Sequence, residues 1–87
     1  MIIDKPTFGS AELGARLADM DREEKINEII LVGVCTDICV ISNAMLVKAF
    51  LPEVPVSVIS SLCAGVSVES HNRALEAMKV CQINIKK

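Results

Sequence analysis

Eight consecutive residues, Gly33 to Val40 (GVCTDICV), carry the side chains of this chain best suited to chemistry. They follow the apolar run Ile29–Val32, which is typical of a buried strand, and precede a mostly apolar segment that ends at Phe50 and is typical of a buried helix. We therefore expect Cys39 in the first turn of a helix, just past a tight strand-to-helix turn. There the unpaired backbone N–H groups and the helix dipole favour an anion. A thiolate in that position is stabilised and makes a better nucleophile near neutral pH.

The four cysteines also allow other interpretations, which their spacing disfavours. A four-thiolate zinc site needs two closely spaced pairs, but Cys63 and Cys81 stand alone. A disulfide framework is typical of secreted chains, and no secretion signal is visible. A Cys35–Cys39 redox pair has three intervening residues, where thioredoxin-like motifs have two. One reactive cysteine and three packed ones is the favoured interpretation.

Composition limits the possible partners. The net charge is −2 and Phe8 and Phe50 are the only aromatic residues, so neither a nucleic acid nor an anionic membrane surface is expected as a partner. No apolar run approaches the roughly 20 residues that span a bilayer. The N-terminal residues 1–5 lack a signal-peptide pattern, so we expect a cytoplasmic protein.

The hydrophobic content is high for so short a chain. At 87 residues the sequence allows one small domain, yet 52% of its residues are hydrophobic. That excess predicts apolar surface beyond what one such domain can enclose. We therefore expect a homo-oligomer, or a missing part of the same fold.

Periodicity predicts strands that alternate with helices, and hence an α/β fold with a parallel sheet and right-handed crossovers. Glu28–Val32 is expected to be a central strand covered on both faces. In such sheets ligands bind beyond the carboxyl ends of the strands. Three segments reach that edge, namely residues 4–5, 33–39 and 60–65. The expected strands are residues 1–3, 28–32, 56–60 and 81–86, and the expected helices are residues 11–20 (capped by Ser10), 38–50 (capped by Thr36 or Asp37) and 68–80 (capped by Ser67), with residues 21–25 as a solvated polar segment.

The sequence resembles the isochorismatase-like cysteine hydrolases, the superfamily that includes nicotinamidase. Gly33 to Val40 resembles the family signature of glycine, two small or apolar residues, Thr-Asp, any residue and Cys-Val. Residues 5–10 (KPTFGS) resemble the segment that carries the family's active-site lysine. Residues 64–67 (AGVS), followed by Glu69 and His71, resemble the entry to its C-terminal helix. The resemblance covers essentially the whole chain in the right order.

The resemblance implies a Rossmann-like three-layer α/β/α fold and a set of site residues. Cys39 would be the nucleophile, and the positive charge of Lys5 would stabilise its thiolate and the developing anion. The backbone N–H groups of Cys35 and Cys39 would form the oxyanion hole. The peptide bond between Val34 and Cys35 would be cis, with Thr36 and Asp37 as structural groups of the turn. His71 is expected to be a packed or interface residue.

The chain departs from the family pattern at one catalytic position. The family's third catalytic residue is an aspartate at the end of its first strand, in a protein about twice this long, and a chain that starts at Met1 has no place for it. Asp4 is a poor substitute, because it neighbours Lys5 and adjacent strand residues point to opposite faces. Ser61 stands where many members have Asp. Residues 1–87 are therefore interpreted as the C-terminal portion of the hydrolase domain.

Two functions follow as hypotheses. The first is a cysteine hydrolase that cleaves a small amide or related C–N bond through a thioester on Cys39, as part of a longer parent. No cofactor or metal is expected in this portion, because the metal ligands of nicotinamidases lie in the absent half. The alternative is a non-catalytic half-domain that associates with itself or with a complementary half. A weaker third hypothesis is a redox module built on a reversible Cys35–Cys39 disulfide.

Overall fold

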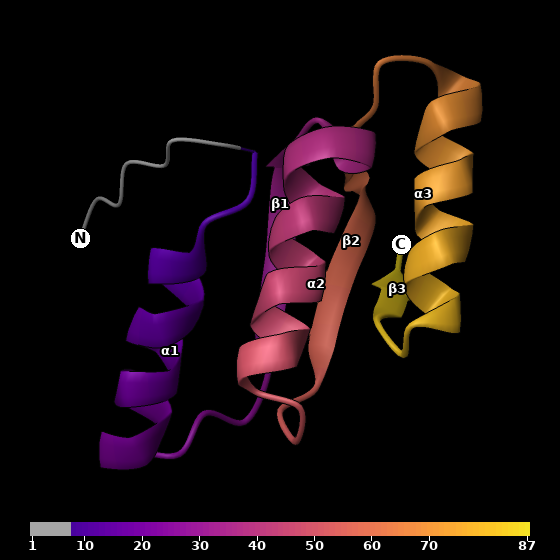
Figure 1. The fold of residues 1–87 in the computed structure, drawn as a ribbon. Coiled ribbons are helices and arrows are strands. Elements are labelled where there is room, and N and C mark those ends of the chain that lie inside the picture. Colours follow the sequence, from indigo (N-terminus) through magenta and orange to yellow (C-terminus); the bar gives the residue numbers. More distant parts are fainter. Residues whose placement is uncertain (1–7) are drawn as a thin grey trace.

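The computed structural model describes residues 8–87, and the strand predicted at residues 1–3 lies outside this range. Helices and strands alternate along the chain, as the periodicity predicts (Figure 1). The elements in chain order are α1 (Ala11–Glu23), β1 (Ile29–Val34), a π-helical turn η1 (Thr36–Val40), α2 (Ile41–Phe50), β2 (Val56–Ala64), α3 (Val68–Val80) and β3 (Asn84–Lys86).

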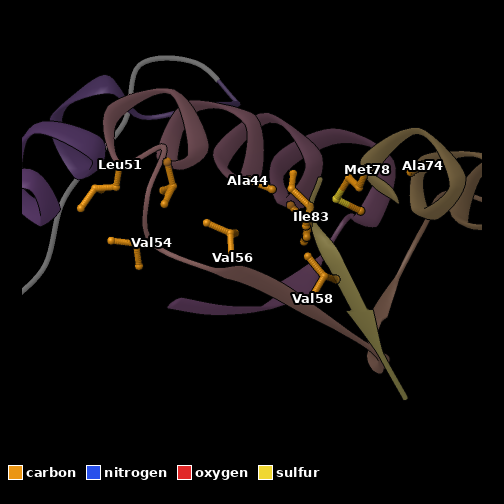
Figure 2. Packing of buried hydrophobic residues seen from close by; sticks show 10 residues of the cluster. Ala44, Leu51, Val54, Val56, Val58, Ala74, Met78 and Ile83 are labelled. Carbon is orange, nitrogen blue, oxygen red and sulfur yellow. The ribbon is translucent and has the colours of Figure 1, made fainter. Parts of the chain in front are cut away.

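The three strands form one parallel sheet whose spatial order, β1-β2-β3, is also the chain order. The predicted α/β class with a parallel sheet is confirmed. Right-handed crossovers between strands that advance in one direction place both connecting helices on the same face. Accordingly, α2 and α3 lie on one side of the sheet, and α1 lies beside α2 (Figures 1 and 2). The described residues thus supply the sheet and one of the helical layers.

The core lies between the sheet and these helices. Val56 and Val58 of β2 are fully buried beneath Ala44 of α2, which is also fully buried (Figure 2). Val47 of α2 is a fully buried member of the same cluster. Met78 brings α3 into the same cluster. Because α2 packs against α1, α3 and the sheet, the prediction of a buried helix that ends at Phe50 is confirmed. No helix within residues 8–87 is long and apolar enough to cross a membrane.

The position of β1 differs from the prediction. Within residues 8–87, β1 pairs only with β2 and forms an edge, and its burial alternates along the strand. Ile29 and Leu31 pack toward the core, whereas the exposed fractions of Ile30, Val32 and Val34 are 49%, 52% and 68%. The run of apolar residues suggested cover on both faces, but the helices of this part of the chain cover one face only. We call the other side the open face.

A small polar cluster occupies one end of the open face. Glu28 accepts hydrogen bonds from Lys86 (2.8 Å) and from the Ser57 hydroxyl (2.7 Å). The hydrogen bond from Lys86, followed by that from Ser57, holds the pKa of the Glu28 carboxyl below its usual value. These contacts join the residue before β1 to β2 and β3, so they tie the three strands together at that end.

Two of the predicted helix starts are confirmed. Ser10 caps α1 by accepting a hydrogen bond from the N–H of Leu13, and Ser67 caps α3 through the N–H of Ser70. The end predicted for the first helix at Met20 is wrong, because α1 continues to Glu23. Arg22 and Glu23 are exposed helix formers, and the Asp21 carboxylate accepts a hydrogen bond from the N–H of Ile26 at 2.7 Å, so hydrophobic periodicity does not detect these residues.

Candidate active site at the carboxyl ends of β1 and β2

The chain turns sharply between β1 and α2. The Val34–Cys35 peptide bond is cis, as the resemblance implies. The Cys35 carbonyl then accepts hydrogen bonds from the N–H groups of Ile38 (3.1 Å) and Val40 (3.0 Å), and the second of these spans five residues, as in a π-helix. Cys39 therefore lies in the π-helical turn that runs directly into α2. The prediction of a helix that begins at residue 38 is corrected, because the α-helix proper starts at Ile41.

Thr36 and Asp37 do not cap the helix, contrary to prediction. The N-cap position belongs to Cys35, which makes no side-chain capping bond. The fully buried hydroxyl of Thr36 is hydrogen-bonded to Nδ1 of His71 on α3 at 2.7 Å. One carboxylate oxygen of Asp37 accepts a hydrogen bond from the N–H of Val66 at 3.2 Å. Both side chains therefore attach the turn to the segment that enters α3, instead of closing the helix locally.

The end of β2 and the loop after it lie next to the turn. At this end of the sheet Gly33 of β1 pairs with Cys63 of β2, and Val34 pairs with Ala64. The register shifts between Leu31 and Gly33, where β2 has more residues than β1. A Cβ on Gly65 would lie about 3.0 Å from the backbone of His71, so only glycine allows the loop to approach α3 this closely. An open cavity of about 400 Å³ is lined by residues 63–68 and His71. Two of the three segments predicted at the carboxyl edge are thus brought together.

Asn43 is a site residue that the sequence reasoning missed. Its side chain reaches from α2 to the segment before α1, where Oδ1 accepts a hydrogen bond from the N–H of Ser10 at 2.8 Å. Its Nδ2 donates to the carbonyl of Cys39 at 3.1 Å and to that of Phe8 at 3.4 Å. A lone amide in a mostly apolar helix was the available signal.

The remaining predicted site residues are placed as follows. Cys39 and Cys35 are half-buried, and none of the four cysteines forms a disulfide bond with another. Lys5 and Asp4 lie outside the described residues. Within residues 8–87 no three His, Cys, Asp or Glu side chains are close enough to hold a metal ion.

Comparisons with known proteins show which family and which solved structures this chain resembles. A family model, the isochorismatase domain, matches residues 1–85. A search of curated proteins finds no match to the sequence. Among solved structures, the nicotinamidase of Staphylococcus aureus is 32% identical with a TM-score of 0.78, and the match covers 97% of this chain and 53% of that one. The pyrazinamidase/nicotinamidase of Streptococcus mutans is also 32% identical, with a TM-score of 0.78 and coverage of 95% and 45%.

A third structure, the pyrazinamidase of Pyrococcus horikoshii in complex with zinc, is 28% identical with a TM-score of 0.78. The match covers 97% of this chain and 45% of that one, so this chain spans about half the length of the proteins it resembles. The family match extends over nearly the whole sequence, and the TM-scores show that the arrangement of strands and helices described above follows the fold of these hydrolases. On that evidence the chain belongs to the isochorismatase family.

Proposed function

We propose that this chain is the nucleophile-bearing, C-terminal portion of a cysteine hydrolase that cleaves a small amide or a related C–N bond. The observation that carries the proposal is the position of Cys39. It lies in the tight turn at the carboxyl end of β1. That turn is attached to α3 by the Thr36–His71 hydrogen bond and to the loop before α3 by the Asp37–Val66 hydrogen bond. Ligands of parallel α/β sheets bind at this edge.

The proposed chemistry proceeds in two balanced steps. In the first, Sγ of Cys39 attacks the amide carbonyl carbon, the C–N bond breaks, and the amine leaves with one proton more than it had in the amide. In the second, water adds to the thioester carbonyl, and the acid and the free thiol are released. The Lys5 ammonium stabilises the thiolate, and the backbone N–H groups of Cys35 and Cys39 bind the oxyanion.

The proton acceptor for the thiol is assigned outside this chain. In the described part of the chain, Asp37 is the carboxylate on the Cys39 turn, and it is engaged by the N–H of Val66. The similar hydrolases are about twice as long, and we assign the acid–base group to chain that they have and this sequence lacks. A small carboxamide is the proposed substrate class, since the three similar structures are named for the hydrolysis of nicotinamide or pyrazinamide.

The test begins with the intact mass of the protein made from its native gene. That protein is then assayed for ammonia release from nicotinamide, pyrazinamide and simple aliphatic amides. We expect Cys39→Ala to abolish turnover, because the thioester cannot form. Cys81→Ala, at an exposed thiol beyond α3, is the matched control and should keep the wild-type rate. A Cys39→Ala variant that retains wild-type turnover would show that the mechanism is wrong.

A second candidate function, a non-catalytic half-domain that associates with itself or with a complementary half, is favoured by the open face. Ile30, Val32 and Val34 of β1, together with Leu62 of β2 (58% exposed), give that face an apolar surface. Size-exclusion chromatography with light scattering tests this function. We expect a particle larger than the 9.4 kDa monomer, and Val32→Lys should shift it toward the monomer. A well-folded wild-type monomer would exclude self-association.

A further inference from the structure

The helix α1 has one main packing partner in the described part of the chain. It packs against α2, and no other helix or strand within residues 8–87 contacts it to a comparable extent. The helix α3, which is also 13 residues long, packs against η1, α2, β2 and β3. Figure 1 shows the same contrast, because α1 lies at one side of the molecule and α2 lies between it and α3. Within this range, a single interface therefore holds α1 in place.

On its own, α1 would be a weak helix. Isolated helices shorter than about 12–15 residues are marginal in water, and α1 has 13 residues. Gly14 lies in the interior of α1, where glycine destabilises a helix relative to alanine. The glycine allows close docking instead, because a Cβ at this position would overlap the ring of Phe50 on α2. The helical state of α1 thus depends on its contact with α2.

Asn43 of α2 closes this interface at the start of α1. Its Oδ1 accepts a hydrogen bond from the N–H of Ser10 at 2.8 Å, and its Nδ2 donates to the carbonyl of Phe8 at 3.4 Å. Ser10 is buried, and its side chain caps α1. The backbone lies directly on α2 here, since a Cβ on Gly9 would be 2.7 Å from Cδ1 of Leu46. One amide side chain therefore joins the segment before α1 to α2.

The other end of α1 is tied to its own connection to β1. That connection is residues 24–28, and all of them except Ile26 are exposed. The N–H of Ile26 donates a hydrogen bond to Oδ1 of Asp21 at 2.7 Å. Because both partners belong to α1 and its connection, this bond can persist when α1 separates from α2. Residues 24–28 can therefore serve as a hinge.

We infer that residues 8–23, which we call the strap, open from α2 as one unit while α2, α3 and the sheet stay folded. Segments with few buried contacts open at a lower free energy than the whole domain. Opening exposes Leu13 and Leu17, which are half-buried against the core, and uncovers the ring of Phe50. The strap opens whether or not Cys39 is a nucleophile, so the inference goes beyond the proposed function.

Native-state hydrogen exchange, read residue by residue by NMR on the full 87-residue chain, tests this inference. The exchange rate of each amide, divided by its rate in an unfolded peptide, gives an opening constant. We expect the amides of residues 15–23 to share one opening constant, about tenfold or more above that of the β2 amides. A gradient that rises toward the ends of α1 would indicate fraying and would contradict opening as a unit.

Three variants separate the strap from the rest of the chain. Asn43→Ala removes the bonds to Ser10 and Phe8, so the opening constants of residues 15–23 should rise about fivefold to tenfold. Ile83→Val lies in the buried core next to Met78, outside the contact between α1 and α2 (Figure 2). It should raise the opening constants of the β2 amides about twofold to tenfold and leave those of the strap unchanged. Asn72→Ala, at an exposed position of α3, is the matched control and should leave the strap unchanged.

Three results overturn the inference. The first is an equal opening constant for the strap and for β2, and the second is an Ile83→Val variant that accelerates both by the same factor. Either would show that residues 8–87 open only as one cooperative unit. The third is an unchanged strap in Asn43→Ala. Failure of the hydrolase proposal has a different signature, because a native gene product that releases no ammonia from any amide leaves these exchange rates as they are.

Discussion

The hydrogen bond between Thr36 and His71 offers the sharpest test of how the Cys39 turn is held. Thr36→Val keeps the shape of the side chain and removes the hydroxyl, which is fully buried and 2.7 Å from Nδ1 of His71. Leaving a buried polar partner unpaired costs about 1–3 kcal/mol. His71 is half-buried, and water can partly replace the lost hydroxyl, so we expect about 1–2 kcal/mol.

Urea unfolding followed by circular dichroism measures this loss. With an m-value of about 1 kcal/mol per molar, typical of a small domain, the midpoint should fall by about 1–2 M. His71→Ala should cost at least as much, because it leaves the wholly buried hydroxyl of Thr36 without its partner. In a double-mutant cycle the two changes should fall short of additivity by about 0.5–1.5 kcal/mol. Asn72→Ala is the control. A Thr36→Val midpoint equal to that of the control, or strict additivity, would refute the argument.

Two further predictions concern the sheet. Gly33 has φ +129°, and no atom lies within 4 Å of the place where a Cβ would be. Gly33→Ala should therefore lower the free energy of unfolding by about 1–3 kcal/mol through backbone strain alone. An unchanged urea midpoint would contradict this. The pKa of Glu28 is lowered from 4.5 by its hydrogen bonds from Lys86 and Ser57, so its contribution to stability is complete above about pH 4.5 and is lost as the pH falls through the lowered value. Thermal unfolding of Glu28→Gln should therefore show a lower Tm than wild type at pH 7 and a smaller difference at pH 3; a difference that grows on acidification would be inconsistent with this.

Local signals in the sequence were sufficient for the starts of α1 and α3 and for the fold class. Ser10 and Ser67 cap helices through hydrogen bonds that span three residues. Because donor and acceptor are so close in the sequence, a short sequence pattern is enough to predict these caps. The predicted bounds of α3, Val68 to Val80, are those observed. Alternation of strands and helices sufficed for the parallel sheet, because each crossover uses neighbouring elements.

The site needed information that local patterns do not contain. Thr36 and Asp37 have the residue types of helix caps, but their partners lie 35 and 29 residues away, in a loop that only the folded chain brings close. Asn43 is similar, since its bonds reach 33 and 35 residues back. The status of β1 as an edge could not be predicted from its five apolar residues, because a run of apolar residues does not show which face of a strand the helices cover.

The composition and place of β1 have a consequence for handling the protein. Its six residues, IILVGV, contain no charge and no proline, and in the described part of the chain one backbone edge of the strand carries no partner strand. Short segments of this kind stack into cross-β fibrils when their edges are free. A partner strand on this edge would therefore also protect the chain from fibrillar aggregation. Purified samples should be kept at low concentration and checked for thioflavin-positive material.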